Sequence, residues 1–222
     1  MNFDELFEFL IDLNHEDHNH KAWMDIHRSR YENVRDSYIE FLEDLSKDLG
    51  SIHPDYHPTT GKQAINRINN NKVFHPNKPT YKDHFGAGLD KAKNYADFYI
   101  HLGVNECFVA GGFFHAPSEI LTKIRAAIDY NGDELKAILN KPDFKAYYDS
   151  PFTDDALKTS PKGYSQEHPH IDLLRLKSFA VMHPIPLKTV TTTGFKEELI
   201  KAYLLLLPFR DYLNQAVGFA ED

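Results

Sequence analysis

HFGAGLDKAKNYADFYIHLGVNECFVAGGFF, residues 84 to 114, carries most of the information on the architecture of this chain. Three short runs in it, HFGAGLD, DFYIHLG and ECFVAGGFF, have the period-two or fully apolar character of strands, and turn-rich chain separates them. Gly103, Val104 and Asn105 stand between the last two runs, where a tight turn makes a hairpin. The run QAINRI has similar character, so we expect strands from Lys62 to Phe114.

Helical patterns precede these strands. Asn2 followed by Glu5 resembles a capping box and predicts a short N-terminal helix. A stripe of apolar residues then predicts a long amphipathic helix over residues 20 to 49, which Gly50 can terminate. We expect this long helix to pack on the sheet.

Further helices follow the strands. Pro117 opens the helix PSEILTKIRAAIDY, which Asn131-Gly132 closes, and DELKAIL forms another. Pro169 opens a short helix, PHIDLLRL, before a strand, KSFAVMHP. The last pattern, FKEELIKAYLLLLPFRDYLNQAV, is helical on both sides of Pro208, which should kink or split it.

Strands in the middle of the chain with helices before and after them predict an α+β fold with a mostly antiparallel central sheet. The strand near Phe179 should join the same sheet. With 222 residues and 41% hydrophobic content the chain can bury a sizeable core, and we expect a single domain over residues 1–222.

Composition excludes several classes of protein. One cysteine, Cys107, cannot form an intrachain disulfide. The N-terminus has no basic region of a secretory signal, and AYLLLLPF is too short to span a bilayer, so we expect a soluble, cytoplasmic protein without a membrane partner. The net charge of -8 argues against nucleic-acid binding.

The charge is unevenly distributed along the chain. Residues 1 to 61 hold 5 Lys and Arg against 14 Asp and Glu, whereas residues 62 to 101 hold 7 against 3. The positive part contains RINNNKVFHPNKPTYK, residues 67 to 82. Its asparagines and prolines are turn formers, but its cations, Arg67, Lys72, Lys78 and Lys82, suit recognition of carboxylate or phosphate on a pre-organised loop.

Other motifs favour structural interpretations. HEDHNH, residues 15 to 20, has metal-ligand residue types, but it is not HExxH and it precedes a helix, where polar side chains satisfy free backbone donors. Cys107 lies in a strand without an electropositive setting. The glycine pairs form neither GxGxxG nor GxxxxGK[ST]. We therefore predict no metal and no organic cofactor.

A second cluster lies around PHIDLLRL. Asp172 and Arg175, three residues apart, make an ordinary surface pair in the favoured interpretation. Alternatively, His168 and Asp172 share a helix face and act as a catalytic acid/base pair in a cleft. Lys177 lies just beyond them.

The chain resembles a bacterial family of uncharacterised proteins, domain of unknown function 2461. The similarity runs through FLIDLNHEDHNHKAWMDIHRSRYE, RINNNKVFHPNKPTYKDHFGAGL, FVAGGFFHAPSEILTKIRAAI and LKTSPKGYSQEHPHIDLLRLKSF, and so covers essentially the whole chain. The family has no assigned activity to transfer. The resemblance strengthens the fold prediction and the choice of site.

Within the basic stretch the family pattern reads approximately RxxRDxRFxxDKxPYK. The chain agrees at Arg67, Phe74, Lys78, Tyr81 and Lys82. It departs where Asn70 replaces an arginine, Asn71 an aspartate, Val73 an arginine, Asn77 an aspartate and Thr80 a proline. These replacements remove charges of both signs, so an ion-pair network implied there is partly neutralised in this chain.

The later block agrees better. Its matching residues are Pro161, Lys162, Gly163, His168, Pro169, Asp172, Leu173, Leu174, Arg175, Lys177 and Phe179. We expect a binding domain in which one basic cleft takes a phosphorylated or carboxylate-bearing small molecule. Its ligand-binding residues would be Arg67, Lys78, Tyr81, Lys82, Lys162, Arg175 and Lys177.

Two alternatives to the binding domain remain open. One is an enzyme, a hydrolase or transferase of an anionic substrate, with His168 and Asp172 as catalytic residues. The other is a protein-interaction scaffold, which requires an exposed apolar patch rather than a polar cleft.

Overall fold

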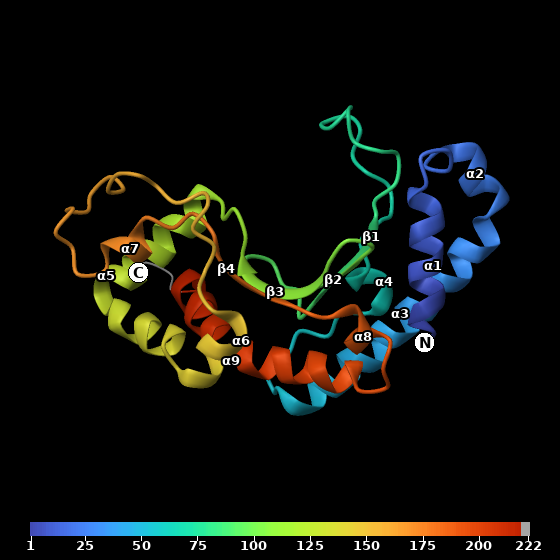
Figure 1. Ribbon diagram of the computed structural model, residues 1–222. Coiled ribbons are helices and arrows are strands. Elements are labelled where there is room, and N and C mark those ends of the chain that lie inside the picture. The colour runs from blue at the N-terminus through green and yellow to red at the C-terminus, as the bar shows by residue number, and fades with distance from the viewer. Residues whose placement is uncertain (219–222) are drawn as a thin grey trace. The chain divides into compact units, whose positions relative to one another are not determined.

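The computed structural model describes residues 1–218 and confirms the α+β prediction. Its four-stranded antiparallel sheet has the order β1-β2-β3-β4, with β1 His84–Leu89, β2 Asp97–Gly103, β3 Cys107–Phe113 and β4 Phe179–Pro184 (Figure 1). The predicted hairpin joins β2 and β3, where the Gly103 N–H donates to the Glu106 carbonyl at 3.0 Å. The strand predicted near Phe179 joins the same sheet as β4.

Helices lie before and after the strands in sequence. They are α1 Phe3–Asn14, α2 Lys21–Ile26, α3 Arg28–Ile52, α4 Gly61–Ala64, α5 Ser118–Leu139, α6 Pro142–Tyr148, α7 Ile171–Leu174, α8 Leu187–Val190 and α9 Phe195–Gly218. Asn2 caps α1 as predicted, because its side-chain oxygen accepts from the N–H groups of Asp4 and Glu5. No helix within residues 1–218 is long and apolar enough to cross a bilayer.

Several predicted boundaries were wrong. The long helix is interrupted at His27, so α2 and α3 are separate, and α3 runs past Gly50 to Ile52. QAINRI forms no strand: α4 ends within it, and only Ile65 makes an isolated bridge, to Ala87. The capping box that Thr60 and Gln63 form starts a helix at this place instead of a strand.

Two interruptions were predicted within the later helices. Asn131, with φ -147° and ψ 56°, leaves helical geometry, so α5 consists of two helices joined at a kink, where the sequence predicted one helix to end and DELKAIL to begin. Pro208 lies inside α9, which is not split there. The predicted kink at Pro208 stays a prediction.

The chain forms two compact units. Unit 1 contains residues 1–91, 99–109 and 184–200, and unit 2 contains residues 92–98, 110–183 and 201–222. Each unit is therefore built from three separate stretches of chain. The expectation of a single domain stays a prediction.

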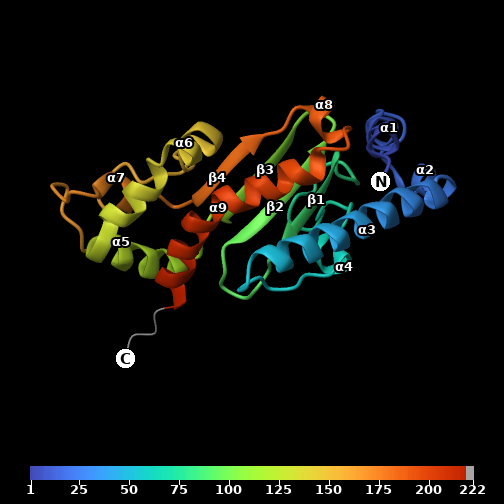
Figure 2. The ribbon, with the colours of Figure 1, turned by 90° about the horizontal axis from the view of Figure 1, so that it is seen from below.

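In unit 1 one face of the sheet packs on α3. Phe85 of β1 is buried against Tyr31 and Tyr38 of α3, with ring centroids 6.4 and 5.9 Å away. Figure 1 shows α3 on the side of β1 opposite the excursion of residues 67–82, and Figure 2, seen from below, shows α3 along its length. Burying a phenylalanine side chain contributes about 2 to 3 kcal/mol, so this contact fixes which face of β1 points inward.

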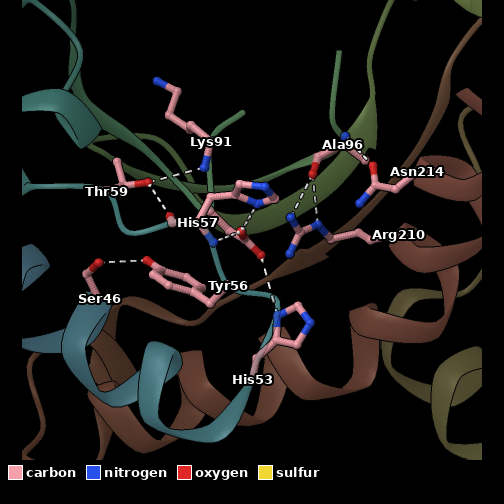
Figure 3. A network of polar contacts seen from close by, with 10 residues as sticks. Ser46, His53, Tyr56, His57, Thr59, Lys91, Ala96, Arg210 and Asn214 are labelled. Carbon is pink, nitrogen blue, oxygen red and sulfur yellow. Dashed lines mark hydrogen bonds and ion pairs between the residues drawn. The ribbon is translucent and has the colours of Figure 1, made fainter. Parts of the chain in front are cut away.

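A polar network in unit 1 holds the chain after α3 against the end of β1 (Figure 3). Asp90 is buried and has a left-handed backbone, with φ 55°. Its carboxylate accepts from the His57 N–H at 2.8 Å and lies 3.1 Å from His57 Nδ1. The Ser46 and Tyr56 hydroxyls are 2.7 Å apart. Buried polar groups that are hydrogen-bonded in this way make the local fold specific.

Unit 2 has its own core. Ile124, Ile128 and Leu135 of α5 are fully buried, and Phe144 of α6 packs on Phe209 of α9 with centroids 5.8 Å apart. The buried Arg210 guanidinium donates to the Ala96 carbonyl through Nε and Nη2, as Figure 3 shows.

Candidate functional site

The basic stretch of residues 67–82 forms a two-armed excursion from unit 1, which we call the basic hairpin. Asn69 and Tyr81 form an antiparallel bridge across its base. The Lys82 N–H donates to the Ile68 carbonyl at 2.8 Å, and the Asn70 N–H donates to the Thr80 carbonyl at 3.0 Å. Backbone pairing therefore orders the base of the hairpin.

Side chains outside the hairpin anchor its base. Asn19, between α1 and α2, accepts from the Tyr81 N–H at 2.8 Å and donates to the Tyr81 carbonyl at 3.2 Å. Tyr81 itself is 5% exposed, and burial raises the pKa of its hydroxyl. Tyr81 thus offers little surface to a ligand, and its visible role is to hold the hairpin.

The hairpin brings three of the predicted cations together. Lys82 Nζ donates to the Arg67 carbonyl at 2.7 Å, which joins the two arms. Burial lowers the pKa of Lys82, and the positive charges of Arg67 and Lys78 lower it further. Within residues 1–218 no carboxylate lies within ion-pair distance, 4.0 Å, of any of these three side chains.

The hairpin leads directly into β1, where unit 1 carries a row of stacked rings on the sheet face turned away from α3. In β2 the residues Ile100 and Leu102 are buried, whereas Tyr99 and His101 are only partly buried on the opposite face. The His101 ring stacks on His84 at 4.0 Å and on Phe108 at 4.4 Å. We call His84, His101 and Phe108 the ring row.

The chemistry of the ring row follows from its packing. Burial lowers the pKa of His101 to about 4, with a further contribution from His84, so this imidazole is neutral at pH 7. His84 Nδ1 lies 2.9 Å from an Asp83 carboxylate oxygen. The neutral His101 ring, stacked between His84 and Phe108, therefore contributes to packing on this sheet face and does not act as a general acid at pH 7.

Sequence reasoning missed the ring row, although a signal existed. The run DFYIHLG alternates buried apolar residues with Tyr99 and His101, so both rings had to share one face of the strand. Gly86 provides the space beside them, because a Cβ there would lie 2.5 Å from the Tyr99 hydroxyl.

The later block belongs to unit 2 and is fastened to one side of α5. Arg125 Nε and Nη2 donate to the carbonyls of Leu174 and Leu176 at 2.8 and 3.1 Å. Lys136 Nζ donates to the Pro169 carbonyl at 2.8 Å. These bonds satisfy carbonyl groups of chain that has little secondary structure of its own, which is a structural role.

The predicted catalytic pair is not formed in this block. His168 Nε2 lies 3.0 Å from the Asp129 carboxylate of α5, while His168 Nδ1 accepts from the His170 N–H at 3.1 Å. The Asp172 side chain is 94% exposed and lies 3.8 Å from Arg175 Nη1. The favoured interpretation of Asp172 and Arg175 as a surface pair agrees with this geometry.

The remaining predicted cations lie at separate points of the same block. Lys162 stands in the turn that Gly163, with φ 94°, permits. Lys177 contributes its carbonyl to the Ala116 N–H at 3.1 Å. Because Lys162, Arg175 and Lys177 belong to unit 2 and the basic hairpin belongs to unit 1, one shared basic cleft stays a prediction.

The HEDHNH segment behaves as a helix-capping segment. His20 caps α2, where its Nδ1 accepts from the Trp23 N–H at 3.3 Å. His18 Nδ1 lies 2.7 Å from the Asp12 carbonyl and His15 Nδ1 accepts from the Asp17 N–H at 3.4 Å. Cys107, also considered from the sequence, is buried, and burial raises the pKa of its thiol.

A comparison with known protein families gives a match over most of the chain. The model of the family DUF2461, described as a conserved hypothetical protein, matches residues 5–212. The chain belongs to this family. No curated protein and no solved structure matches it.

As a DUF2461 member the chain departs from the family pattern at positions that the structure now locates. Asn70, in the place of an arginine, donates from Nδ2 to the Pro79 carbonyl at 3.1 Å and so braces the two arms of the basic hairpin. The Asn71 backbone carbonyl accepts from the His75 N–H at 3.0 Å. A side-chain amide bond of Asn70 thus stands where the resemblance implies a charged residue, and within residues 1–218 no carboxylate pairs with Arg67, Lys78 or Lys82.

Proposed function

We propose that the basic hairpin binds a phosphorylated or carboxylate-bearing small molecule through Arg67, Lys78 and Lys82. One observation supports this above the others: Lys82 Nζ reaches across to the Arg67 carbonyl, and no carboxylate of residues 1–218 pairs with the three cations. Cations held together without a counter-charge repel one another. An external anion relieves this repulsion and is the natural partner.

The energy of such contacts suffices for useful affinity. Each charged hydrogen bond to a well-placed anion contributes roughly 1.5 to 3 kcal/mol. Three of them total roughly 4.5 to 9 kcal/mol, and since association costs at least about 4 kcal/mol, we expect binding in the millimolar to high-micromolar range when the site is pre-organised. Backbone pairing at the hairpin base and the Asn19 anchor provide that pre-organisation for Lys82.

The test uses calorimetric titration with pyrophosphate and with citrate, which present phosphate and carboxylate groups respectively. Lys82→Ala and Arg67→Ala should each weaken binding about tenfold or more, because each removes one charged contact. Lys62→Ala is the matched control. Lys62 lies on α4, outside the basic hairpin, and its charge, after the larger effect of Arg35, helps to lower the pKa of Asp36.

Loss of binding in the two hairpin variants but not in Lys62→Ala supports the proposal. Equal weakening in all three variants means that the anion responds to net charge alone. Binding of neither anion to the parent protein at low ionic strength contradicts the proposal, because screening is weakest there.

A further inference from the structure

The connection between β3 and α5, in unit 2, holds an imidazole that no part of the proposed anion site uses. His115 Nδ1 lies 3.0 Å from Asp155 Oδ2, and the His115 side chain is 63% exposed. Asp155 comes from the irregular chain before α7, and its side chain is only 17% exposed. The imidazole is therefore held at one nitrogen by a mostly buried carboxylate and open to solvent at the other.

This bond selects one tautomer of His115. A carboxylate can only accept, so Nδ1 carries the proton and donates it to Asp155, and Nε2 keeps its lone pair. Among residues 1–218, Nε2 has no hydrogen-bond partner. An exposed, oriented lone pair next to a supporting carboxylate is the arrangement that a general base requires.

The backbone of His115 is also constrained. Its φ of 49° lies in the left-handed region, which costs a non-glycine residue about 1 kcal/mol. Ser178, which is fully buried, secures this conformation, because its Oγ accepts from the His115 N–H at 2.9 Å and donates to Asp155 Oδ2 at 2.9 Å. Three separate segments thus converge to fix one exposed side chain.

Asp155 has capacity left for a further donor. Both hydrogen bonds to the Asp155 carboxylate reach Oδ2, while Oδ1 is buried and has no hydrogen-bond partner in the described residues 1–218. Buried acceptors are usually satisfied, so Oδ1 stands out among the polar atoms of this part of the chain.

Aromatic rings flank the same imidazole. The Phe114 ring is centred 4.1 Å from the His115 ring and packs edge-on against Phe152 at 5.4 Å. Phe114 is 61% exposed, so its ring offers a flat apolar surface beside the imidazole ring. A substrate with an aromatic group could rest there by stacking.

We propose that His115 is the general base of a hydrolytic site for carboxylic esters that carry an aromatic group, with Asp155 as its positioning residue. His115 Nε2 removes a proton from water while the water oxygen bonds to the ester carbonyl carbon. The carbon–oxygen bond to the leaving group then breaks, and the departing oxygen takes the proton from Nε2. The products are one carboxylic acid and one hydroxyl compound, and the imidazole is neutral again.

The structural alternative is that Asp155 and Ser178 only tie the irregular chain to the β3–α5 connection. Both interpretations predict that Asp155→Asn lowers stability. They differ at His115, whose exposed ring can be replaced without unfolding the protein and whose Nε2 matters only for catalysis.

The experiment measures hydrolysis of p-nitrophenyl acetate by the full chain at pH 7.5. Loss of a general base lowers a rate constant by about a hundredfold or more. Uncatalysed hydrolysis of this ester masks part of that loss, so the observed rate constant of His115→Gln should fall by about tenfold or more. His20→Asn is the matched control, since it removes another exposed imidazole that pairs with no carboxylate in residues 1–218, while Asn keeps a side-chain oxygen that can cap α2, and its rate should be unchanged. Added imidazole should restore part of the rate of His115→Ala.

A spectroscopic measurement tests Asp155 separately. In long-range proton–nitrogen spectra, His115 should be protonated at Nδ1 in the parent protein, and Asp155→Asn should shift it towards the Nε2 form while Asp155→Glu retains Nδ1. Equal ester hydrolysis by the parent and His115→Gln, or a His115 that carries its proton on Nε2 in the parent, overturns the proposal.

Discussion

The ring row makes the stability of this protein sensitive to mild acid through one side chain. Burial lowers the pKa of His101 to about 4, whereas an unfolded histidine titrates near 6.5. As the pH falls from 7 to 5, the unfolded chain takes up a proton at this position and the folded chain does not. Stability is therefore present above pH 6.5 and is lost as the pH falls towards 4.

The magnitude follows from these two pKa values. Linkage gives a loss of about 2 kcal/mol between pH 7 and pH 5 for this group alone. The loss is a large part of the stability of a domain, which is typically 5 to 15 kcal/mol. His101 is only partly buried, so a value near 1 kcal/mol is the lower bound of the same effect.

Urea unfolding at both pH values measures this loss. The parent protein is compared with His101→Phe, which keeps an aromatic ring between His84 and Phe108 but cannot titrate. The pH-dependent loss of unfolding free energy should be about 1 to 2 kcal/mol smaller in the variant, because the contributions of all other histidines cancel in the difference. Identical losses in the two proteins would refute the assignment of the acid sensitivity to His101.

Three further predictions concern packing, the hairpin anchor and metal content. Gly61→Ala should lower the free energy of unfolding by about 2 to 4 kcal/mol in urea titrations, because a Cβ there would collide with the backbone carbonyl of Ile39 on α3; an unchanged midpoint contradicts the close approach. Asn19→Ala should cost about 1 to 2 kcal/mol and speed hydrogen exchange of the Tyr81 amide, with Asn14→Ala, which loses a single helix-internal bond, as the control; unchanged exchange rules out the anchor. Purified protein should hold no stoichiometric zinc or nickel, and elemental analysis showing about one metal per chain, lost in His15→Ala/His18→Ala, would falsify this.

Sequence patterns were sufficient for the sheet and insufficient for the helix ends. Period-two alternation located β2, β3 and β4 and the hairpin at Gly103, because pleated strands with one buried face impose that period directly. Gly50 was misread as a helix end, because packing against the rest of the fold overrides the low propensity of a single residue, whereas Asn131 does mark the kink between two helices.

The candidate sites divide in the same way. Arg67, Lys78 and Lys82 come together through contacts within one stretch of sixteen residues. The prolines and asparagines of that stretch predicted turns, so this proximity could be expected from the sequence. The contacts of His168 with Asp129 and of His115 with Asp155 join residues about forty positions apart in sequence. A periodic pattern in the sequence cannot predict such contacts. They arise where the irregular chain before α7 packs against α5 and against the β3–α5 connection.

The division of the chain into interleaved units has a consequence during synthesis. Unit 1 lacks residues 184–200 until the ribosome has translated most of the chain, although its first 91 residues emerge early. At about 5 to 20 residues per second, the nascent N-terminal part waits roughly 5 to 20 s for its missing segment. During that interval Phe3 of α1 and Phe41 of α3 lack the ring of Phe195, against which both pack, so this protein should depend on chaperones bound to the ribosome more than a chain whose units are contiguous.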